Sequence, residues 1–552
     1  MTNVPTNSTA TAGPSAERLF FDCNASYGPV PKKHPLARWT LEHLLEDLNL
    51  AGIAGALVHH RLANHYDPMF SNRMLIREIA PYRDRLFPCW VVTPNLAGES
   101  PEPEALAQEL LEHDVPAVRF EFEFHRTPVK EKIWRPLLDV LRRHQRLIIL
   151  SVNPYEPRFE HVDALLEMLT GTPVVMVNHA WGQWRQVMAM MRTHDHLHLE
   201  FSQFQANRVV ETCIDNFGAH RCLFGTCLPD KAPGAARGFI DYGLFDDATA
   251  DLIAGGNLIR LLQGRKPIPA DPSPWKDDIT RAVKARKPLP CRVIDGHCHL
   301  GDRNVTTLQG GVVSPRADIE GMLELTRRMG IAKTAMMSWT APMGLGTDLG
   351  NQVVADAVDR YPEEIIGLSS INPGYDTPEK IQQIIEEYHE KRGFPGLKCF
   401  CHTTAFKYDA PEFHTWLQYG NDHKLYMVFD PASGMPTDVL EKLTQRYPDL
   451  SIHIDHCGQS WPYAVWAAEM CKRFPNVVAQ LNFTLVTNGT IEYLVKEIGA
   501  DRVLFGTDAP MRDPRPQVTW LAFTKLTLEE KKMVFGEAFA RVLIRAGVKG
   551  LE

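Results

Sequence analysis

The sequence predicts two (β/α)8 TIM-like barrels joined in tandem, and three observations support this prediction. The chain has 552 residues, which is more than one hydrophobic core usually supports, so two domains of barrel size are expected. The second half of the chain repeats the pattern of the first half. Each half also alternates short apolar runs with amphipathic stretches, as strand–helix units do.

The internal duplication is seen when matching segments of the two halves are aligned. The spacing between these segments stays within a few residues over about 250 positions, which chance similarity does not produce. The matched pairs are 19–28 with 292–301, 82–94 with 361–373, 115–119 with 394–398, 177–183 with 454–459, and 221–227 with 502–508.

Eight strands are expected in the second half of the chain. Amphipathic stretches separate them, such as 377–388, in which Ile381, Ile384 and Ile385 share one helix face. Eight strand–helix units in about 260 residues predict a closed barrel whose active face lies at the C-terminal ends of the strands. The expected strands are 292–297, 333–338, 365–371, 396–400, 425–430, 451–456, 477–482 and 503–507.

The chain divides into four expected segments. Residues 1–17 are rich in Thr, Ser, Ala, Asn and Pro and read as a disordered tail. Residues 18–263 form the first barrel and residues 291–552 the second. The segment 264–290 is dense in Pro, Lys and Arg and reads as a linker with a short helix around 277–285.

The composition restricts the partners and the compartment. The net charge of −8 comes from interspersed acidic and basic residues, so neither a nucleic acid nor a membrane surface is an expected partner. No apolar stretch approaches the ~20 residues needed to cross a bilayer. Eleven thinly spread cysteines suit reduced thiols, so we expect a cytoplasmic protein with a small-molecule substrate.

Two histidines and an aspartate are the strongest candidates for a metal site. His297 and His299 are two residues apart on the first strand of the second half, so their side chains point to the same face. Asp508 follows the eighth strand, which is adjacent to the first strand in a barrel. Two imidazoles and a carboxylate are suitable ligands for Zn²⁺ or a similar divalent ion. The alternative for Asp508 is a helix N-cap.

The fifth and sixth strands carry further candidates. His456 ends the sixth strand and could act as general base or acid, or be a core histidine. His453 lies three residues earlier, on the other strand face, and is expected to pack outside the barrel. Asp430 ends the fifth strand, where it is a fourth metal ligand, a proton-transfer carboxylate or the first residue of an Asp-Pro turn.

Three residues are candidates for binding the substrate. Lys398 lies in the fourth strand, where its cation could hold a substrate carboxylate, although an exposed or snorkelling lysine also fits the sequence. Trp339 and His402 are expected to line the pocket.

These motifs together resemble the amidohydrolase superfamily. They are Asp-Gly-His-Cys-His at 295–299, His-Cys-Gly at 456–458 and Leu-Phe-Gly-Thr-Asp at 504–508. The most similar branch is the amidohydrolase-related group, which contains aminocarboxymuconate-semialdehyde decarboxylase, benzoate decarboxylases and lactone hydrolases. The resemblance covers both halves, over 19–262 and 291–545.

The resemblance implies roles for individual residues. It implies that His297, His299 and Asp508 bind the metal and that His456 is a base or a substrate polariser. The family usually has a metal-binding histidine after the fifth strand, where this chain has Asp430. Either Asp430 replaces that ligand or the site has three protein ligands.

The first half keeps the barrel pattern but lacks the predicted ligands. Asn24, Ser26 and Cys227 occupy the positions of the two histidines and the eighth-strand aspartate, and only His179 remains of the central set. Asn and Ser are poor ligands for a divalent ion. We therefore expect a pseudoenzyme barrel. Because family members commonly pair as dimers, the resemblance suggests that this half serves as a built-in partner, with further homo-oligomerisation left open.

The sequence ranks three functions. The first is a metal-dependent hydrolase of a small organic acid, amide or lactone that uses a metal-activated water. In this reaction His456 would manage protons, and Asp508 could both bind the metal and accept the water proton. Zn²⁺ is the expected ion, with Mn²⁺ or Co²⁺ as alternatives. The second is a metal-dependent, non-oxidative decarboxylase of a small carboxylic acid, and the third is a catalytically silent binding or scaffold protein.

Overall fold

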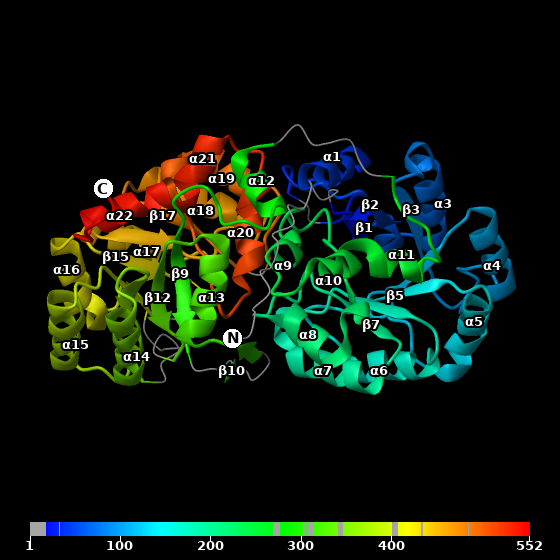
Figure 1. Ribbon diagram of the computed structural model, residues 1–552, viewed down its shortest axis with the longest axis horizontal. Coiled ribbons are helices and arrows are strands. Elements are labelled where there is room, and N and C mark those ends of the chain that lie inside the picture. The colour runs from blue at the N-terminus through cyan, green and yellow to red at the C-terminus, as the bar shows by residue number, and fades with distance from the viewer. Residues whose placement is uncertain are drawn as a thin grey trace, which may run out of the picture.

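The computed structural model shows two barrels side by side, each built from eight parallel strands (Figure 1). It describes residues 18–31, 34–268, 276–301, 304–306, 313–340, 346–399, 407–431, 434–483 and 485–552. In each sheet the strands follow one another in chain order, apart from the inserted hairpin β10–β11 (Asn304–Thr306 and Val313–Pro315). The predicted fold class is confirmed.

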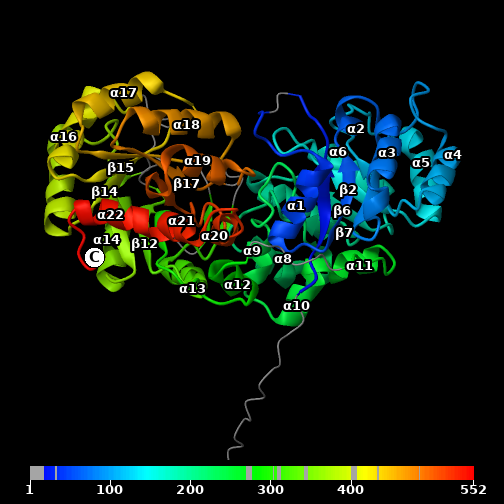
Figure 2. The same ribbon diagram turned by 90° about the horizontal axis from the view of Figure 1, so that it is seen from above.

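The first barrel alternates strands with helices on its outer surface (Figure 2). Its strands are β1 Phe21–Tyr27, β2 Gly55–His60, β3 Leu86–Val91, β4 Ala117–Phe120, β5 Leu147–Ser151, β6 Val174–Val177, β7 Leu197–Glu200 and β8 Cys222–Leu223. Its helices are α1 Leu41–Ala51, α2 Leu62–His65, α3 Pro68–Glu78, α4 Pro103–Glu112, α5 Glu131–Arg143, α6 Phe159–Met168, α7 Trp184–Thr193, α8 Val209–Phe217, α9 Arg237–Asp241, α10 Asp247–Asp251 and α11 Asn257–Leu261.

The second barrel repeats this plan. Its strands are β9 Ile294–Leu300, β12 Lys333–Ser338, β13 Ile365–Ser369, β14 Gly396–Lys398, β15 Tyr426–Phe429, β16 Ser451–Ile454, β17 Val477–Leu481 and β18 Val503–Phe505. Its helices are α13 Ile319–Met329, α14 Thr347–Arg360, α15 Pro378–Ile384, α16 His414–Asp422, α17 Thr437–Arg446, α18 Trp461–Arg473, α19 Thr490–Ile498, α20 Pro514–Ala522, α21 Leu528–Lys532 and α22 Ala538–Arg545. In the part of the chain that the structure describes, no helix has the length and apolar composition needed to cross a membrane.

A short helix, α12 (Asp278–Lys284), lies in the segment that joins the barrels. Asp277 caps its N-terminus by accepting a hydrogen bond from the backbone N–H of Thr280. The other oxygen of Asp277 lies 2.6 Å from Nζ of Lys531 in α21. The connecting segment is therefore anchored to the second barrel.

Strand alternation sorts the side chains of β16 between the helices and the barrel interior. The two isoleucines of β16 pack outward in the main core, whereas His453 and Asp455 point inward and are fully buried. His453 stacks on the Tyr426 ring at 4.7 Å between centroids. The expectation that His453 packs outside the barrel is therefore wrong. It assumed that the strand continues to His456, but His456 has a φ of 58° and turns back toward the interior.

A buried carboxylate joins the first strand to the eighth strand in each barrel. In the second barrel, Asp295 Oδ1 accepts the backbone N–H groups of His297 and Thr507, and Oδ2 accepts the Thr507 hydroxyl at 2.5 Å. In the first barrel, Asp22 accepts the matching three hydrogen bonds from Asn24 and Thr226. Burial raises the pKa of Asp22 and Asp295 to about 6, although these hydrogen bonds act to lower it. Both barrels close through the same contact.

The two barrels meet through equivalent helices. Helix α9 follows the eighth strand of the first barrel, α20 follows the eighth strand of the second, and the two pack together. A Cβ at Gly238 of α9 would lie 2.3 Å from the backbone oxygen of Arg515 in α20, so the backbones approach closely. Arg515 is fully buried and pairs with Asp513 at 2.6 Å and with Glu211 of the first barrel. The interface is therefore closely packed around a buried arginine that is paired with carboxylates from both barrels.

Candidate active site

Two imidazoles and a carboxylate converge at the C-terminal end of the second barrel. Nε2 of His299 lies 3.2 Å from Nε2 of His297 and 3.3 Å from Oδ1 of Asp508. Nε2 of His297 lies 3.7 Å from the same oxygen. All three residues are at most 2% exposed. The structure therefore brings together residues separated by more than 200 positions in the sequence, as the barrel topology predicts.

The outer ring nitrogens of both histidines face oxygen acceptors. Nδ1 of His297 lies 3.1 Å from Oε1 of Gln480, whose amide nitrogen donates to the Gly296 carbonyl. Nδ1 of His299 lies 3.4 Å from the Ser338 carbonyl oxygen. These acceptors suit a proton on Nδ1 of each ring, and with that tautomer the two Nε2 lone pairs face each other and Asp508.

This arrangement fits a divalent cation. Without a cation, two lone pairs and a carboxylate oxygen at these separations repel one another. The pairwise distances are below about 4.2 Å, twice the usual metal–ligand bond length. Burial raises the pKa of Asp508, but the Arg512 cation and the His299 ring lower it to about 2, so Asp508 is ionised. His297, His299 and Asp508 are thus suited to hold such an ion.

Lys398 offsets the charge of two further carboxylates, which lie beside the site of His297, His299 and Asp508. Its Nζ lies 2.6 Å from Oδ2 of Asp455 and 3.3 Å from Oδ2 of Asp430, and all three residues are buried. Burial lowers the pKa of Lys398, but the two carboxylates raise it above its usual value. The donor atoms of Asp430 gather with those of Asp455 and His456. Asp430 therefore has a partner cation already, and its role as a fourth metal ligand stays a prediction.

His456 is held between oxygen acceptors on both sides of its ring. Its Nδ1 contacts Oδ1 of Asn482 and lies 3.3 Å from Oδ1 of Asp455, and its Nε2 lies 3.7 Å from Oδ2 of Asp430. Burial lowers the pKa of His456, but Asp455 and Asp430 raise it to about 9. The imidazolium form is therefore favoured at neutral pH, and this form is a proton donor.

The three residues predicted to bind substrate differ in where the structure places them. Lys398 reaches the site but pairs with carboxylates of the protein. Trp339 is buried, and its ring centroid lies 5.9 Å from that of His299, so it borders the site. His402 lies outside the described residues.

Sequence reasoning missed several residues that support this site. Asp455 contacts Lys398, His297 and His456, and it accepts a hydrogen bond from Asn482 at 2.8 Å. Gln480 and Asn482 alternate along β17 and its extension, so period-two spacing could have revealed them. Arg512, in the loop after β18, lies 3.6 Å from Oδ2 of Asp508, and its spacing gave no signal.

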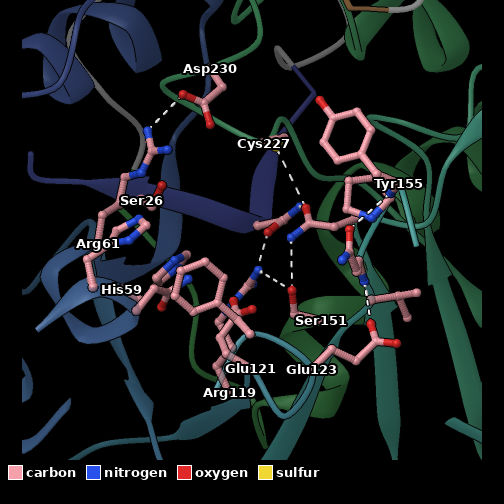
Figure 3. A pocket seen from close by; sticks show the side chains of 18 of the residues that line it. Ser26, His59, Arg61, Arg119, Glu121, Glu123, Ser151, Tyr155, Cys227 and Asp230 are labelled. Atoms are coloured by element: carbon pink, nitrogen blue, oxygen red, sulfur yellow. Dashed lines mark hydrogen bonds and ion pairs between the residues drawn. The ribbon is translucent and has the colours of Figure 1, made fainter. Parts of the chain in front are cut away.

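The first barrel has a polar cavity at the equivalent place (Figure 3). The cavity has a volume of about 420 Å³, and its lining includes Asn24, Ser26, Ser151 and Cys227. Arg119 donates to the Asn24 side-chain oxygen at 3.0 Å and to the Ser151 hydroxyl at 3.2 Å, where the second barrel has an imidazole and a carboxylate. The cavity therefore has hydrogen-bonding groups in place of the converging metal donors.

The strand register corrects one step of the sequence alignment. β5 pairs Ile148 with Val174, and β15 pairs Met427 with Ile452. Counting forward along β6 and β16 places Asn178, with a φ of 65°, at the position of His456. His179 instead is buried against Phe204 and lies outside the cavity lining. The first barrel therefore has no counterpart of the imidazole at position 456.

Comparison with known proteins adds a family to this geometry. The model of the amidohydrolase family matches residues 44–263 and 294–543, which includes most of both barrels.

Curated relatives include gamma-resorcylate decarboxylases. The protein of that name from Polaromonas sp. is 32% identical over 148 residues, which cover 23% of this chain and 43% of the relative. The chain thus matches less than half the length of that relative. The protein from Rhizobium radiobacter is 23% identical over 249 residues, covering 35% of this chain and 74% of the relative.

Solved structures of one-barrel size also match. A dihydroxybenzoic acid decarboxylase from Polaromonas sp., solved with bound manganese and the inhibitor 2-nitroresorcinol, is 16% identical with a TM-score of 0.37. The match covers 46% of this chain and 97% of that one.

Proposed function

The chain belongs to the amidohydrolase family, and we propose that its second barrel is a metal-dependent, non-oxidative decarboxylase of a small hydroxybenzoate-type acid. The observation that carries this proposal is the position of His456 beside the three converging donors. Its ring nitrogens face Asn482 and the carboxylates of Asp430 and Asp455. A proton donor next to a site for a carboxylate substrate suits protonation at carbon.

The reaction replaces a carboxylate by a proton. A divalent ion held by His297, His299 and Asp508 would supply a Lewis acid that binds and orients substrate oxygens. His456 donates its proton to the ring carbon that bears the carboxylate. The carbon–carbon bond then breaks, its electron pair returns to the ring, and CO₂ leaves. Asp430 and Asp455 hold the His456 ring in place and favour its return to the protonated form.

Decarboxylation has more support than hydrolysis, which the sequence alone ranks first. The surroundings of His456 favour the protonated ring, which suits a proton donor to carbon more than a base for an attacking water. The curated relatives that match are decarboxylases by name. Zn²⁺, Mn²⁺ and Co²⁺ all accept two imidazoles and a carboxylate, so the ion is assigned as divalent with Zn²⁺ as the first expectation.

The first barrel is proposed as a non-catalytic partner of the second. Its three changed ligand positions, its polar cavity and the close α9–α20 contact support this role. A fragment of residues 286–552 that is soluble, monomeric and fully active would contradict it.

The experiment that tests the proposed function compares CO₂ release with acid release. The full chain, loaded in turn with Zn²⁺, Mn²⁺ and Co²⁺, is given 2,6-dihydroxybenzoate and, separately, lactone and amide substrates. We expect CO₂ and resorcinol in equal amounts from the acid, with one solvent deuterium on the product ring in D₂O. Acid release from a lactone or amide without CO₂ from the acid would support hydrolysis instead. Neither product with any ion would support a silent scaffold.

A further inference from the structure

Arg512 is a buried cation beside the converging residues, and some of its hydrogen-bond donors have no acceptor among the described residues. It is 5% exposed, and its Nε and Nη1 make no hydrogen bond to any residue that the structure describes. Leaving such donors buried without an acceptor is unfavourable. An acceptor from outside the protein would satisfy them.

The position of Arg512 places those donors at the edge of the proposed site. Its Nη1 lies 3.6 Å from Oδ2 of Asp508, which is beyond hydrogen-bond distance, while Oδ1 of Asp508 faces His299. Asp508 therefore attracts the guanidinium group of Arg512 by charge but accepts no hydrogen bond from Nη1. A ligand anion that enters beside Asp508 would meet a planar cation with two N–H-bearing nitrogens that no described residue engages.

Two aromatic rings hold the guanidinium group in this position. Its central carbon lies 3.9 Å from the ring centroid of Trp181 and 4.8 Å from that of Phe483. Trp181 follows β6 and belongs to the first barrel, whereas Phe483 follows β17 of the second barrel. The Phe483 ring also lies 4.8 Å from the His456 ring. Arg512 and the proposed proton donor thus contact the same aromatic side chain.

The first barrel also fixes the backbone on either side of Arg512. The indole N–H of Trp181 donates to the Met511 carbonyl oxygen. The backbone N–H of Asp513 donates to the Gln205 carbonyl at 2.9 Å, and the backbone N–H of Arg208 donates to the Asp513 carboxylate at 2.9 Å. Three residues of the first barrel therefore hold the loop that carries Arg512.

We propose that Arg512 binds the carboxylate of the substrate and that the first barrel, through Trp181, holds Arg512 in position for this contact. This inference rests on the proposed function, because it assumes an acid as substrate. Arginine suits the role because its donors match the planar carboxylate and it stays charged when buried. Lys398, by comparison, is already paired with Asp430 and Asp455.

The test measures binding instead of turnover. Benzoate, which has the carboxylate, and resorcinol, which lacks it, are titrated calorimetrically into the full chain, both metal-loaded and chelator-treated. For Arg512→Gln we expect a rise of about tenfold to a hundredfold in the Kd of benzoate, as for a lost hydrogen bond to a charged group. The Kd of resorcinol should change by less than about threefold.

Variants of the first barrel test the positioning role. Trp181→Ala should raise the Kd of benzoate by about three- to tenfold by removing the cation–π contact, and Trp181→Phe should restore part of this loss. Two controls alter the first barrel away from Arg512. Tyr155→Ala removes a ring that is 82% exposed, and Arg61→Gln removes a cation paired with Asp230 at the cavity of that barrel. Neither control should change benzoate binding.

The outcomes separate this inference from the proposed function. Equal benzoate affinity in wild type and Arg512→Gln overturns the carboxylate site, and a loss with Arg61→Gln instead places benzoate in the first barrel. Unchanged binding in Trp181→Ala overturns the positioning role. Loss of benzoate binding in Arg512→Gln without CO₂ release by the wild type supports the site and overturns the decarboxylase. If Arg512→Gln does not fold, Arg512→Lys replaces it, with an expected loss of about three- to tenfold; unchanged affinity there overturns the site.

Discussion

The two barrels share a framework and differ in the groups that the framework presents. Asp22 and Asp295 close their barrels through the same three hydrogen bonds. The residue two positions after each aspartate is Asn24 in the first barrel and His297 in the second. The contacts that close a barrel are therefore separable from those predicted to hold an ion, and the first barrel shares the closing contacts with the second.

The cation of the fourth strand shows the same separation. Lys398 and Arg119 occupy matching positions, and both are buried. Lys398 neutralises two carboxylates near His456, whereas Arg119 pairs with Glu121 at 2.5 Å and donates to Asn24. In the first barrel the cation thus contributes to a hydrogen-bonded floor, and the following predictions test that difference.

The largest effect is expected from removing the paired imidazoles. His297→Ala with His299→Ala should abolish metal binding and lower CO₂ release by on the order of a thousandfold or more. Asn24→Ala with Ser26→Ala is the matched change in the first barrel, and it should leave both the metal content and the rate of CO₂ release within about twofold of wild type. Metal analysis of the purified chain and a CO₂ assay measure these effects. Full turnover without both imidazoles would contradict the assignment of the site.

The converse change should give the first barrel a metal site. Asn24→His, Ser26→His and Cys227→Asp together restore the ligand types on a framework that still has the Asp22 contacts. We expect bound metal to rise from about one to about two equivalents per chain. CO₂ release should stay at the wild-type level, because Asn178 occupies the position of His456. An unchanged metal content would show that the framework alone does not position the ligands.

A smaller effect is expected from the residue that orients His297. Gln480→Leu removes the nearer of two acceptors at Nδ1 and leaves only Asp455 Oδ1 at 3.3 Å, so it should weaken metal binding by about tenfold. In the first barrel, Glu200 lies at the matching position and contacts Asn24. Glu200→Leu should leave metal affinity unchanged, as competition with a chelator would show. Equal effects of the two changes would place metal in both barrels.

The smallest effect concerns one buried histidine in each barrel. Burial lowers the pKa of both His179 and His453 to about 3. Below about pH 6.5 these two histidines take up protons in the unfolded chain but not in the folded chain. Each histidine therefore lowers the free energy of unfolding as the pH falls toward 3. His179→Leu or His453→Leu should each reduce the stability loss between about pH 7 and pH 5.5 by about 1 kcal/mol. Urea unfolding at both pH values checks this, and an unchanged pH dependence would contradict neutral burial.

The sequence was sufficient for the fold and for the converging ligands. Short apolar strands between amphipathic helices specify a barrel, and a barrel places its first and eighth strands side by side. This topology brings His297, His299 and Asp508 together without any knowledge of side-chain packing. The structure has all eight predicted strands of the second half, and six of them are shorter than predicted by one or two residues.

The remaining contacts depend on features that strand periodicity does not encode. His456 and Asp508 both have a φ of 58°, a left-handed conformation that residue type rarely reveals for non-glycine residues. The same feature at Asn178 led to the one-residue misalignment with His179. The Trp181–Arg512 contact depends on how two complete barrels pack, so neither half of the sequence contains it alone.

The contact between α9 and α20 has a consequence for how this molecule can change. In a homodimer built on such a contact, every substitution appears on both faces at once, so each face must satisfy both roles. In a fused chain the two faces accept substitutions independently. One copy can then lose its catalytic residues while its surface is selected to position a single loop of the other copy. Asymmetry of this kind is closed to a dimer of identical chains.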